Sequence, residues 1–230
     1  MDIRRKIEVF GDSILKGIQV NPLNRRYHVN NNIDIEMLSK KFSLDVINHS
    51  LLGCTVTKGK ALLERFLSKA PTATAIIMDY GGNDCDFDWK AVSEDPTAEH
   101  EPKTPINKFV AIYTEMVEKI SKCGIRPVLT NLPPLEPQRY FDWFAKELNK
   151  DALLKWLDGV NTIYRFQEMY SRTVEDIAKT TGALLVDLRG TFLKERHIKR
   201  FLCEDGIHPN TEGQKLITQA FSKFCVKALA

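Results

Sequence analysis

Long hydrophobic runs are missing from this sequence of 230 residues. The basic start, residues 1–6, is followed by an apolar run that spans only residues 7–10. That run is far too short for the core of a signal peptide or for a membrane-spanning helix. We therefore expect a protein without a membrane span that stays in the cytoplasm.

Neither sign of charge is in excess, because 33 Lys and Arg residues are nearly balanced by 30 Asp and Glu residues, for a net charge of +3. No segment gathers Lys and Arg with interleaved aromatic residues, as a nucleic-acid groove requires. Nucleic acid is therefore not an expected partner.

Paired cysteines are also missing. The five cysteines are Cys54, Cys85, Cys123, Cys203 and Cys225, and none of them forms a CxxC motif. An odd number in a chain without an export signal favours free thiols. We expect no structural disulfide and no metal site, and we expect Cys54 and Cys85, which lie near the motifs below, to be small buried side chains.

What the sequence does contain is a regular alternation of apolar strands and amphipathic helices. Strands are predicted over residues 7–11, 44–50, 74–80, 126–131 and 183–187, and helices over 33–42, 58–69, 106–123, 163–181 and 211–228. Gly124 and Gly182 stand where left-handed caps would end two of these helices. Parallel strands need crossover connections, and right-handed crossovers cover both faces of a sheet. The pattern predicts one α/β domain over residues 1–230, a three-layer α/β/α sandwich with a five-stranded parallel sheet.

Polar and glycine-containing segments follow three of the predicted strands. Ser13 follows the first, Gly53 the second and the run 81–84 (GGND) the third. Ligands of such sheets bind beyond the carboxyl ends of the strands. The segment 205–209 (DGIHP) precedes the last helix and can reach the same edge, so a hydroxyl, an imidazole and a carboxylate are predicted to meet there.

The residue types suit acyl transfer, although each fragment alone is ordinary turn chemistry. A serine at the start of a helix has a free backbone N–H and an exposed hydroxyl. Gly53 suits a close approach of backbone to ligand, and two glycines let Asn83 project over the site. Asp12 and Asp84 are expected to hydrogen-bond within their own loops.

At this point the chain resembles the SGNH, or GDSL, hydrolase family, which has a flavodoxin-like α/β/α fold. The four sequence blocks of that family are present once each and in order: Gly11-Asp12-Ser13, residues 48–53 (NHSLLG), residues 81–84 and residues 205–209. One position departs from many members, because Ser50 stands where they have glycine. This change is expected to affect the packing of its loop only.

The resemblance implies roles for these residues. Ser13 would be the nucleophile, His208 the general base and Asp205 the carboxylate that orients the imidazole. The backbone N–H groups of Ser13 and Gly53 and the side-chain amide of Asn83 would form the oxyanion hole. No metal and no cofactor is required by such a site.

All three tryptophans, Trp89, Trp143 and Trp156, fall outside the regular alternation. The stretches near 85–105 and 135–160 exceed usual connections, and we predict insertions there that shape the substrate pocket. Trp143 is predicted to contact substrate. The alternative is that these rings close a small satellite core.

The leading prediction is a serine esterase that hydrolyses a small carboxylic ester, either a short-chain acyl ester or an O-acetyl carbohydrate. A lysophospholipase or thioesterase acting on longer chains is an alternative, as is a non-catalytic binding protein on the same fold. A flavodoxin-like FMN binder fits less well, because no glycine-rich phosphate cradle follows the first strand. The sequence leaves open whether the chain forms a homo-oligomer.

Overall fold

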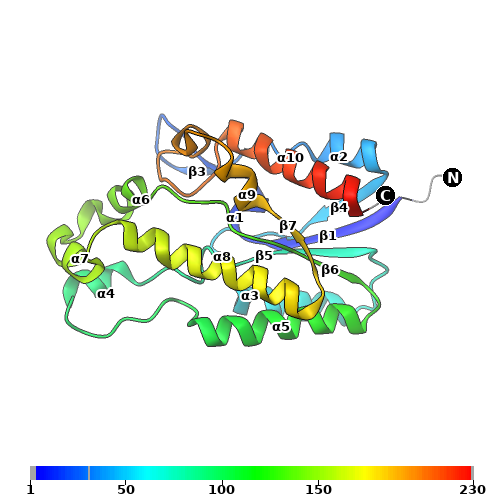
Figure 1. The fold of residues 1–230 in the computed structure, drawn as a ribbon, viewed down its shortest axis with the longest axis horizontal. Coiled ribbons are helices and arrows are strands. Elements are labelled where there is room, and N and C mark those ends of the chain that lie inside the picture. Colours follow the sequence, from blue (N-terminus) through cyan, green and yellow to red (C-terminus); the bar gives the residue numbers. More distant parts are fainter. Residues whose placement is uncertain (1–3, 31, 229–230) are drawn as a thin grey trace.

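A five-stranded parallel sheet forms the centre of the computed structural model, which describes residues 4–30 and 32–228 (Figure 1). The strand order is β4-β1-β5-β6-β7, and each neighbouring pair is parallel. The strands are β1 (Arg5–Gly11), β4 (Leu44–Asn48), β5 (Ala75–Asp79), β6 (Arg126–Thr130) and β7 (Leu184–Val186). The five predicted strands are confirmed.

Helices cover both faces of this sheet. One face carries α2 (Ile35–Phe42), α9 (Leu188–Leu193) and α10 (Thr211–Ala228), and the other carries α3 (Val56–Leu67), α5 (Ile106–Lys122) and α8 (Asn161–Thr181). The five long predicted helices are confirmed, and Gly182 ends α8 in the left-handed conformation, at φ +74°. The three-layer α/β/α architecture is therefore as predicted.

Period-two alternation divides the sheet residues between the two layers. In β1, Phe10 packs into the core beneath α3, α5 and α8, whereas Ile7 and Val9 face α2 and α10. In β5, Met78 faces the layer of α3, α5 and α8, and Ala75 faces the layer of α2 and α10. Because β5 is apolar toward both layers, its residues 75–78 read as a continuous hydrophobic run, the pattern expected of a strand buried on both faces.

Shorter elements occupy the connections. They are α1 (Ser13–Lys16), β2 (Ile18–Val20), β3 (Tyr27–Val29), α4 (Trp89–Glu94), α6 (Pro137–Phe144), η1 (Ala145–Glu147), α7 (Lys150–Leu157) and η2 (Ile198–Phe201). Of these, β2 and β3 pair as an antiparallel hairpin that the periodicity does not predict. Helices α4, α6 and α7 lie in the stretches 85–105 and 135–160, and they pack around a separate apolar cluster with Trp89 and Leu153 at its centre.

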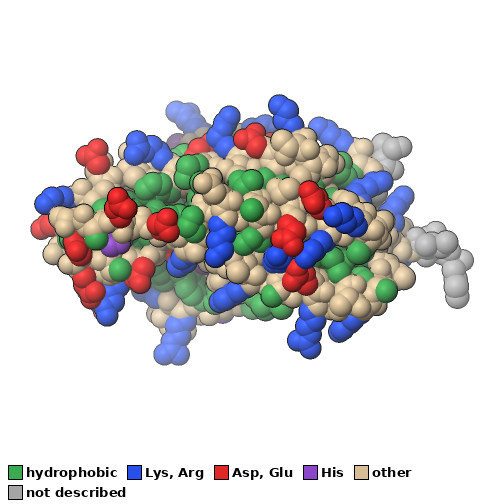
Figure 2. All heavy atoms as spheres, turned by 90° about the horizontal axis from the view of Figure 1, so that it is seen from below, with side chains coloured by type: hydrophobic (Ala, Val, Ile, Leu, Met, Phe, Trp, Pro, Cys, Tyr) green, Lys and Arg blue, Asp and Glu red, His purple; other side chains and the backbone are tan. Residues whose placement is uncertain are grey.

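Charges of both signs are interspersed on the face that includes α5 (Figure 2). Ion pairs join α3 to α5 there, among them Lys60 to Glu115 at 2.6 Å. Throughout the part of the chain that the structure describes, no helix combines the length and the hydrophobicity that crossing a membrane requires. All five cysteines are free, and four of them are buried.

Candidate active site

Ser13 is the first residue of α1, directly after β1. Asp12 caps this helix, because its carboxylate accepts the backbone N–H of Ile14 at 2.8 Å. Gly17 ends the helix after four residues in the left-handed conformation, at φ +77°. This tight turn holds Ser13 at the carboxyl edge of the sheet with its side chain 6% exposed.

His208 and Asp205 complete a hydrogen-bonded chain with Ser13. The Oγ of Ser13 lies 2.8 Å from Nε2 of His208, and Nδ1 of His208 lies 2.5 Å from Oδ2 of Asp205. The carboxylate is fully buried, and its Oδ1 also accepts the backbone N–H groups of Ile207 and His208. A carboxylate so placed accepts a hydrogen bond from Nδ1–H, which leaves Nε2 free to accept the proton of Ser13.

The three predicted oxyanion donors come from three separate loops that meet at this edge. Gly53 follows β4 and has a φ of +69°, and Asn83 follows β5. Within the described residues, the backbone N–H groups of Ser13 and Gly53 donate to no protein atom. Donors left without a protein partner at a helix start and in a loop are available to a ligand oxygen.

Asn83 is oriented by two acceptors. Its Nδ2 lies 3.0 Å from Oδ2 of Asp12 and 3.4 Å from the backbone oxygen of Cys54. Asp84 instead accepts the backbone N–H of Val56 at 3.0 Å, at the start of α3. Asp12 therefore shapes its own loop, as predicted, but both carboxylates also bond to other segments.

Three buried carboxylates lie beneath the site. Burial raises the pKa of Asp12 well above its usual range, and the nearby charge of Asp79 raises it further. Burial also raises the pKa of Asp79 to about 6, opposed by a hydrogen bond from Thr130. For Asp84, burial again raises the pKa to about 6. In each case the buried surroundings disfavour the charged form of the carboxyl group.

The cysteines near the site are neutral thiols. Burial raises the pKa of Cys54 to about 11, and the nearby charge of Asp12 raises it further. Burial likewise raises the pKa of the Cys85 thiol well above its usual range. A thiol with a raised pKa is a poor nucleophile at neutral pH. Both residues are buried, as predicted for small core side chains.

Two connected spaces adjoin Ser13. The inner one is a cavity of about 80 Å³, reached past Ser13 and Asn83 and walled by the apolar side chains of Leu132, Leu135, Ile163, Phe166 and Ile207. The outer one is a wider, open depression of about 600 Å³ that borders Tyr27, Leu52 and Trp143. The site thus has a small apolar end and a broad end open to solvent.

The tryptophans divide between the two predicted roles. Trp143 borders the outer depression, with the guanidinium of Arg25 4.7 Å above its ring. Trp89 is buried and stacks on Phe144 at 4.3 Å between ring centroids. Trp156 packs against the same satellite cluster. The satellite-core alternative therefore holds for Trp156, and Trp89 reaches both the cluster and the pocket wall.

Two features of the site are not predicted from the sequence. Tyr27, from the β2–β3 hairpin, packs edge-on against the His208 ring at 5.0 Å. Asp86 joins three segments: it accepts from the indole N–H of Trp89 and the hydroxyl of Tyr140, both at 2.8 Å, and pairs with Lys103 at 2.7 Å. The GGND run ends two residues before Asp86, but only tertiary contacts reveal these partners.

Comparison with known proteins decides the family. The model of the GDSL-like Lipase/Acylhydrolase family matches residues 9–216. The chain belongs to this family. That assigns this GDSL hydrolase to the ester-hydrolysing enzymes, the esterases and lipases, without specifying a substrate.

Solved structures share the fold of this GDSL hydrolase at low sequence identity. An alpha/beta hydrolase from the metagenome of Lake Arreo, Spain, is 21% identical with a TM-score of 0.68, over 96% of this chain and 94% of that one. A catalytic mutant of an acetylxylan esterase from Geobacillus stearothermophilus is 18% identical with a TM-score of 0.66, over 98% and 96%. A lipase/acylhydrolase from Enterococcus faecalis is 16% identical with a TM-score of 0.66, over 95% and 94%. No curated protein sequence is similar enough to count as a relative.

Proposed function

We propose that this GDSL hydrolase is a serine esterase that cleaves a small carboxylic ester through an acyl-enzyme on Ser13. One observation carries the proposal: Ser13, His208 and Asp205 form a continuous hydrogen-bonded chain at the edge of the sheet where ligands bind. All three side chains are nearly or fully buried, which keeps bulk water from screening their interactions.

In acylation, Oγ of Ser13 attacks the ester carbonyl carbon while Nε2 of His208 takes the hydroxyl proton. Asp205 stabilises the resulting imidazolium without itself taking the proton. The tetrahedral intermediate collapses, the bond to the alcohol oxygen breaks, and His208 returns the proton to that oxygen. The alcohol leaves and the acyl group remains on Ser13.

Deacylation repeats these steps with water. His208 takes a proton from the water molecule as its oxygen attacks the acyl carbon, and Ser13 recovers that proton when it leaves. In both steps the oxyanion is held by the N–H groups of Ser13 and Gly53 and by the amide of Asn83. One such donor contributes about 2.7–4 kcal/mol to transition-state stabilisation.

The two spaces support a short acyl group and a polar alcohol. The inner cavity of about 80 Å³ has room for only a few carbon atoms, given that one water occupies about 30 Å³ in the liquid. The outer depression offers the Trp143 ring together with the carboxylates of Asp86 and Asp88, which suit the apolar faces and hydroxyls of a sugar. One structural neighbour is an acetylxylan esterase, which is consistent with a short acyl group on a sugar.

Hydrolysis of p-nitrophenyl acetate, butyrate and octanoate by the wild type, Ser13→Ala and Ser68→Ala tests this proposal, with fluorophosphonate labelling in parallel. Ser68 is an exposed serine at the end of α3 and serves as the matched control. We expect activity and labelling to be lost only in Ser13→Ala, and acetate and butyrate to be preferred.

Other outcomes have clear meanings. A preference for octanoate would favour the thioesterase or lysophospholipase alternative. Folded wild-type protein that neither reacts with the probe nor hydrolyses any ester would overturn the serine mechanism and favour a binding protein.

A further inference from the structure

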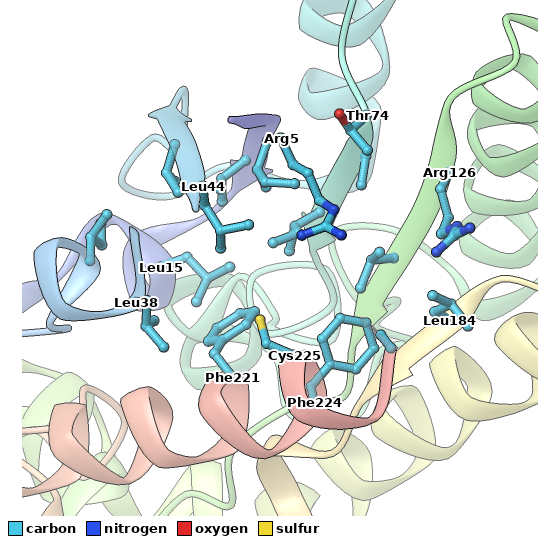
Figure 3. Close-up of a pocket in the computed structure, with 18 of the residues that line it drawn as sticks. Arg5, Leu15, Leu38, Leu44, Thr74, Arg126, Leu184, Phe221, Phe224 and Cys225 are labelled. Carbon is cyan, nitrogen blue, oxygen red and sulfur yellow. The ribbon is translucent and has the colours of Figure 1, made fainter. Parts of the chain in front are cut away.

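An apolar cavity lies between the sheet and helices α2 and α10, away from the candidate active site (Figure 3). Its volume is about 110 Å³. Side chains at the amino ends of the strands surround its mouth, among them Arg5 of β1, Arg126 of β6 and Leu184 of β7. Ser13 lies at the opposite, carboxyl edge of the same sheet, so the two openings are separate.

The cavity walls are hydrophobic. Figure 3 shows Phe221, Phe224 and Cys225 of α10 on one side, with Leu38 and Leu44 on another. Natural cores are packed to the density of organic crystals, and few of their voids exceed the size of a water molecule. An apolar space several times that size stays dry and accepts apolar ligands.

Two arginines give the mouth a positive charge. Ile7, Ala75 and Arg126 are level with one another across the sheet, and Arg5 precedes Ile7 by two residues on the same face. Arg5 and Arg126 therefore project from one face, two strand spacings apart across the sheet and two residues apart along it, or about 12 Å. Two arginine side chains at that distance can converge on one carboxylate.

These two arginines have no competing partner. Among residues 4–30 and 32–228, neither guanidinium forms an ion pair or a side-chain hydrogen bond, and no Asp or Glu lines the cavity. In Figure 3 the guanidinium of Arg5 extends toward the middle of the ring of lining side chains, and that of Arg126 lies beside Leu184. An unpaired positive pair above a dry apolar space is complementary to an anion with a hydrocarbon tail.

The volume of the cavity limits the length of that tail. With about 30 Å³ for one water in the liquid, a cavity of about 110 Å³ has the space of roughly four waters, which suits a tail of about five carbon atoms. We propose that this cavity binds a short-chain fatty acid such as hexanoate, with the carboxylate at Arg5 and Arg126 and the chain between the sheet and α10.

This site does not depend on the proposed esterase function. Its carboxylate end lies at the amino edge of the sheet, and none of the catalytic or oxyanion residues lines it. Fatty-acid binding is therefore expected in Ser13→Ala as in the wild type, and a failure of either proposal can be recognised without the other.

Titration calorimetry with hexanoate tests the proposal. Acetate carries the same carboxylate without the chain, and 1-hexanol carries the chain without the charge. We expect hexanoate to bind both the wild type and Ser13→Ala with one-to-one stoichiometry and to bind more tightly than either control. The double variant Arg5→Met/Arg126→Met should bind about ten- to hundredfold more weakly, because it loses charge-assisted hydrogen bonds. Arg65→Met, an exposed arginine of α3 on the other face of the sheet, should bind like the wild type.

A second variant tests the chain end of the site. Ala75 lies in the cavity wall, so Ala75→Leu fills part of the space while keeping an apolar side chain. Hexanoate should bind this variant more weakly although both arginines remain. If Ala75→Leu does not fold, as judged by circular dichroism, the affinity of the Arg5→Met/Arg126→Met double variant alone tests the proposal.

Two results would overturn the proposal. One is equal affinity for hexanoate in the wild type and the Arg5/Arg126 double variant, which would place the ligand elsewhere. The other is binding only by a variant ending at Ala228, which would make residues 229–230 of this chain the natural occupant of the cavity.

Discussion

The side-chain amide of Asn83 donates to the carboxylate of Asp12, with 3.0 Å between Nδ2 and Oδ2. The same carboxylate accepts the N–H of Ile14 in the first turn of α1. One buried carboxylate thus ties the proposed third oxyanion donor to the helix that carries Ser13. This relationship leads to the first two predictions.

Asn83→Ala should lower kcat by about 10²–10³ and leave KM nearly unchanged, because the amide contacts an oxygen that carries full charge only in the transition state. Steady-state kinetics with p-nitrophenyl acetate measure both constants. Asn149→Ala, which removes the N-cap of α7, is a control that should alter stability but not kcat. A rise in KM at constant kcat would assign Asn83 to substrate binding instead.

Asp12→Asn should lower kcat by about tenfold, because an amide has only one oxygen to accept the hydrogen bonds that Asn83 and Ile14 donate to the two carboxyl oxygens of Asp12. In the double variant with Asn83→Ala, the second change should add little to the first, since both act through one donor. Multiplicative effects in this double-mutant cycle would show that the two residues act independently.

Gly53→Ala should lower both stability and kcat. A Cβ at this residue would meet nothing within 4 Å, so the cost comes from the positive φ of +69°, about 1–2 kcal/mol. Gly124→Ala is the matched control, because Gly124 has a φ of +72° and equally open surroundings. Thermal melts should show similar losses for both variants, and only Gly53→Ala should also lose turnover.

Trp143→Ala should raise KM for esters of large or sugar-like alcohols and change p-nitrophenyl acetate hydrolysis little. The reason is that its ring borders the outer depression and not the inner cavity. Trp156→Ala should instead lower the melting temperature, because that ring packs in the satellite cluster. Unchanged KM values across a panel of esters in folded Trp143→Ala would remove this residue from the substrate site.

Asp79→Asn should stabilise the protein at neutral pH and have a smaller effect in acid. Burial raises the pKa of Asp79 from 3.8 to about 6, so the folded state binds more protons than the unfolded state between these values. The contribution of this group to the free energy of unfolding therefore falls as the pH rises from about 4 to 6, and it stays low above pH 6. Melting temperatures at pH 4, 5, 6 and 7 should show a gain for Asp79→Asn that grows across this window, whereas the exposed Asp45→Asn should show no such trend.

Much of the fold is readable in the sequence because the sheet is buried on both faces. Strands such as β5, with Ile76, Ile77 and Met78 in succession, leave a strong local signal, and so do long helices with one apolar face. The hairpin of β2 and β3 leaves none: its strands have three residues each and carry Gln19 and His28 between apolar neighbours. Tyr27 of this hairpin contacts the rings of Trp143 and His208, and no local pattern reports such contacts.

The candidate active site likewise has features that the sequence predicts and features that only the structure shows. The sequence by itself determined which residues follow the strands, and hence that Ser13, Gly53 and Asn83 lie at one edge, because parallel strands place their carboxyl ends together. For Asp205 and His208 it indicated only that their segment can reach this edge, and the fold brings them to Ser13. Only the tertiary structure decided the partners of Asp12 and Asp86, the separation of Trp143 from the satellite core, and the cavity between β1 and α10. These depend on side chains distant in sequence that meet in space, and on the volume left between packed layers, which no periodicity encodes.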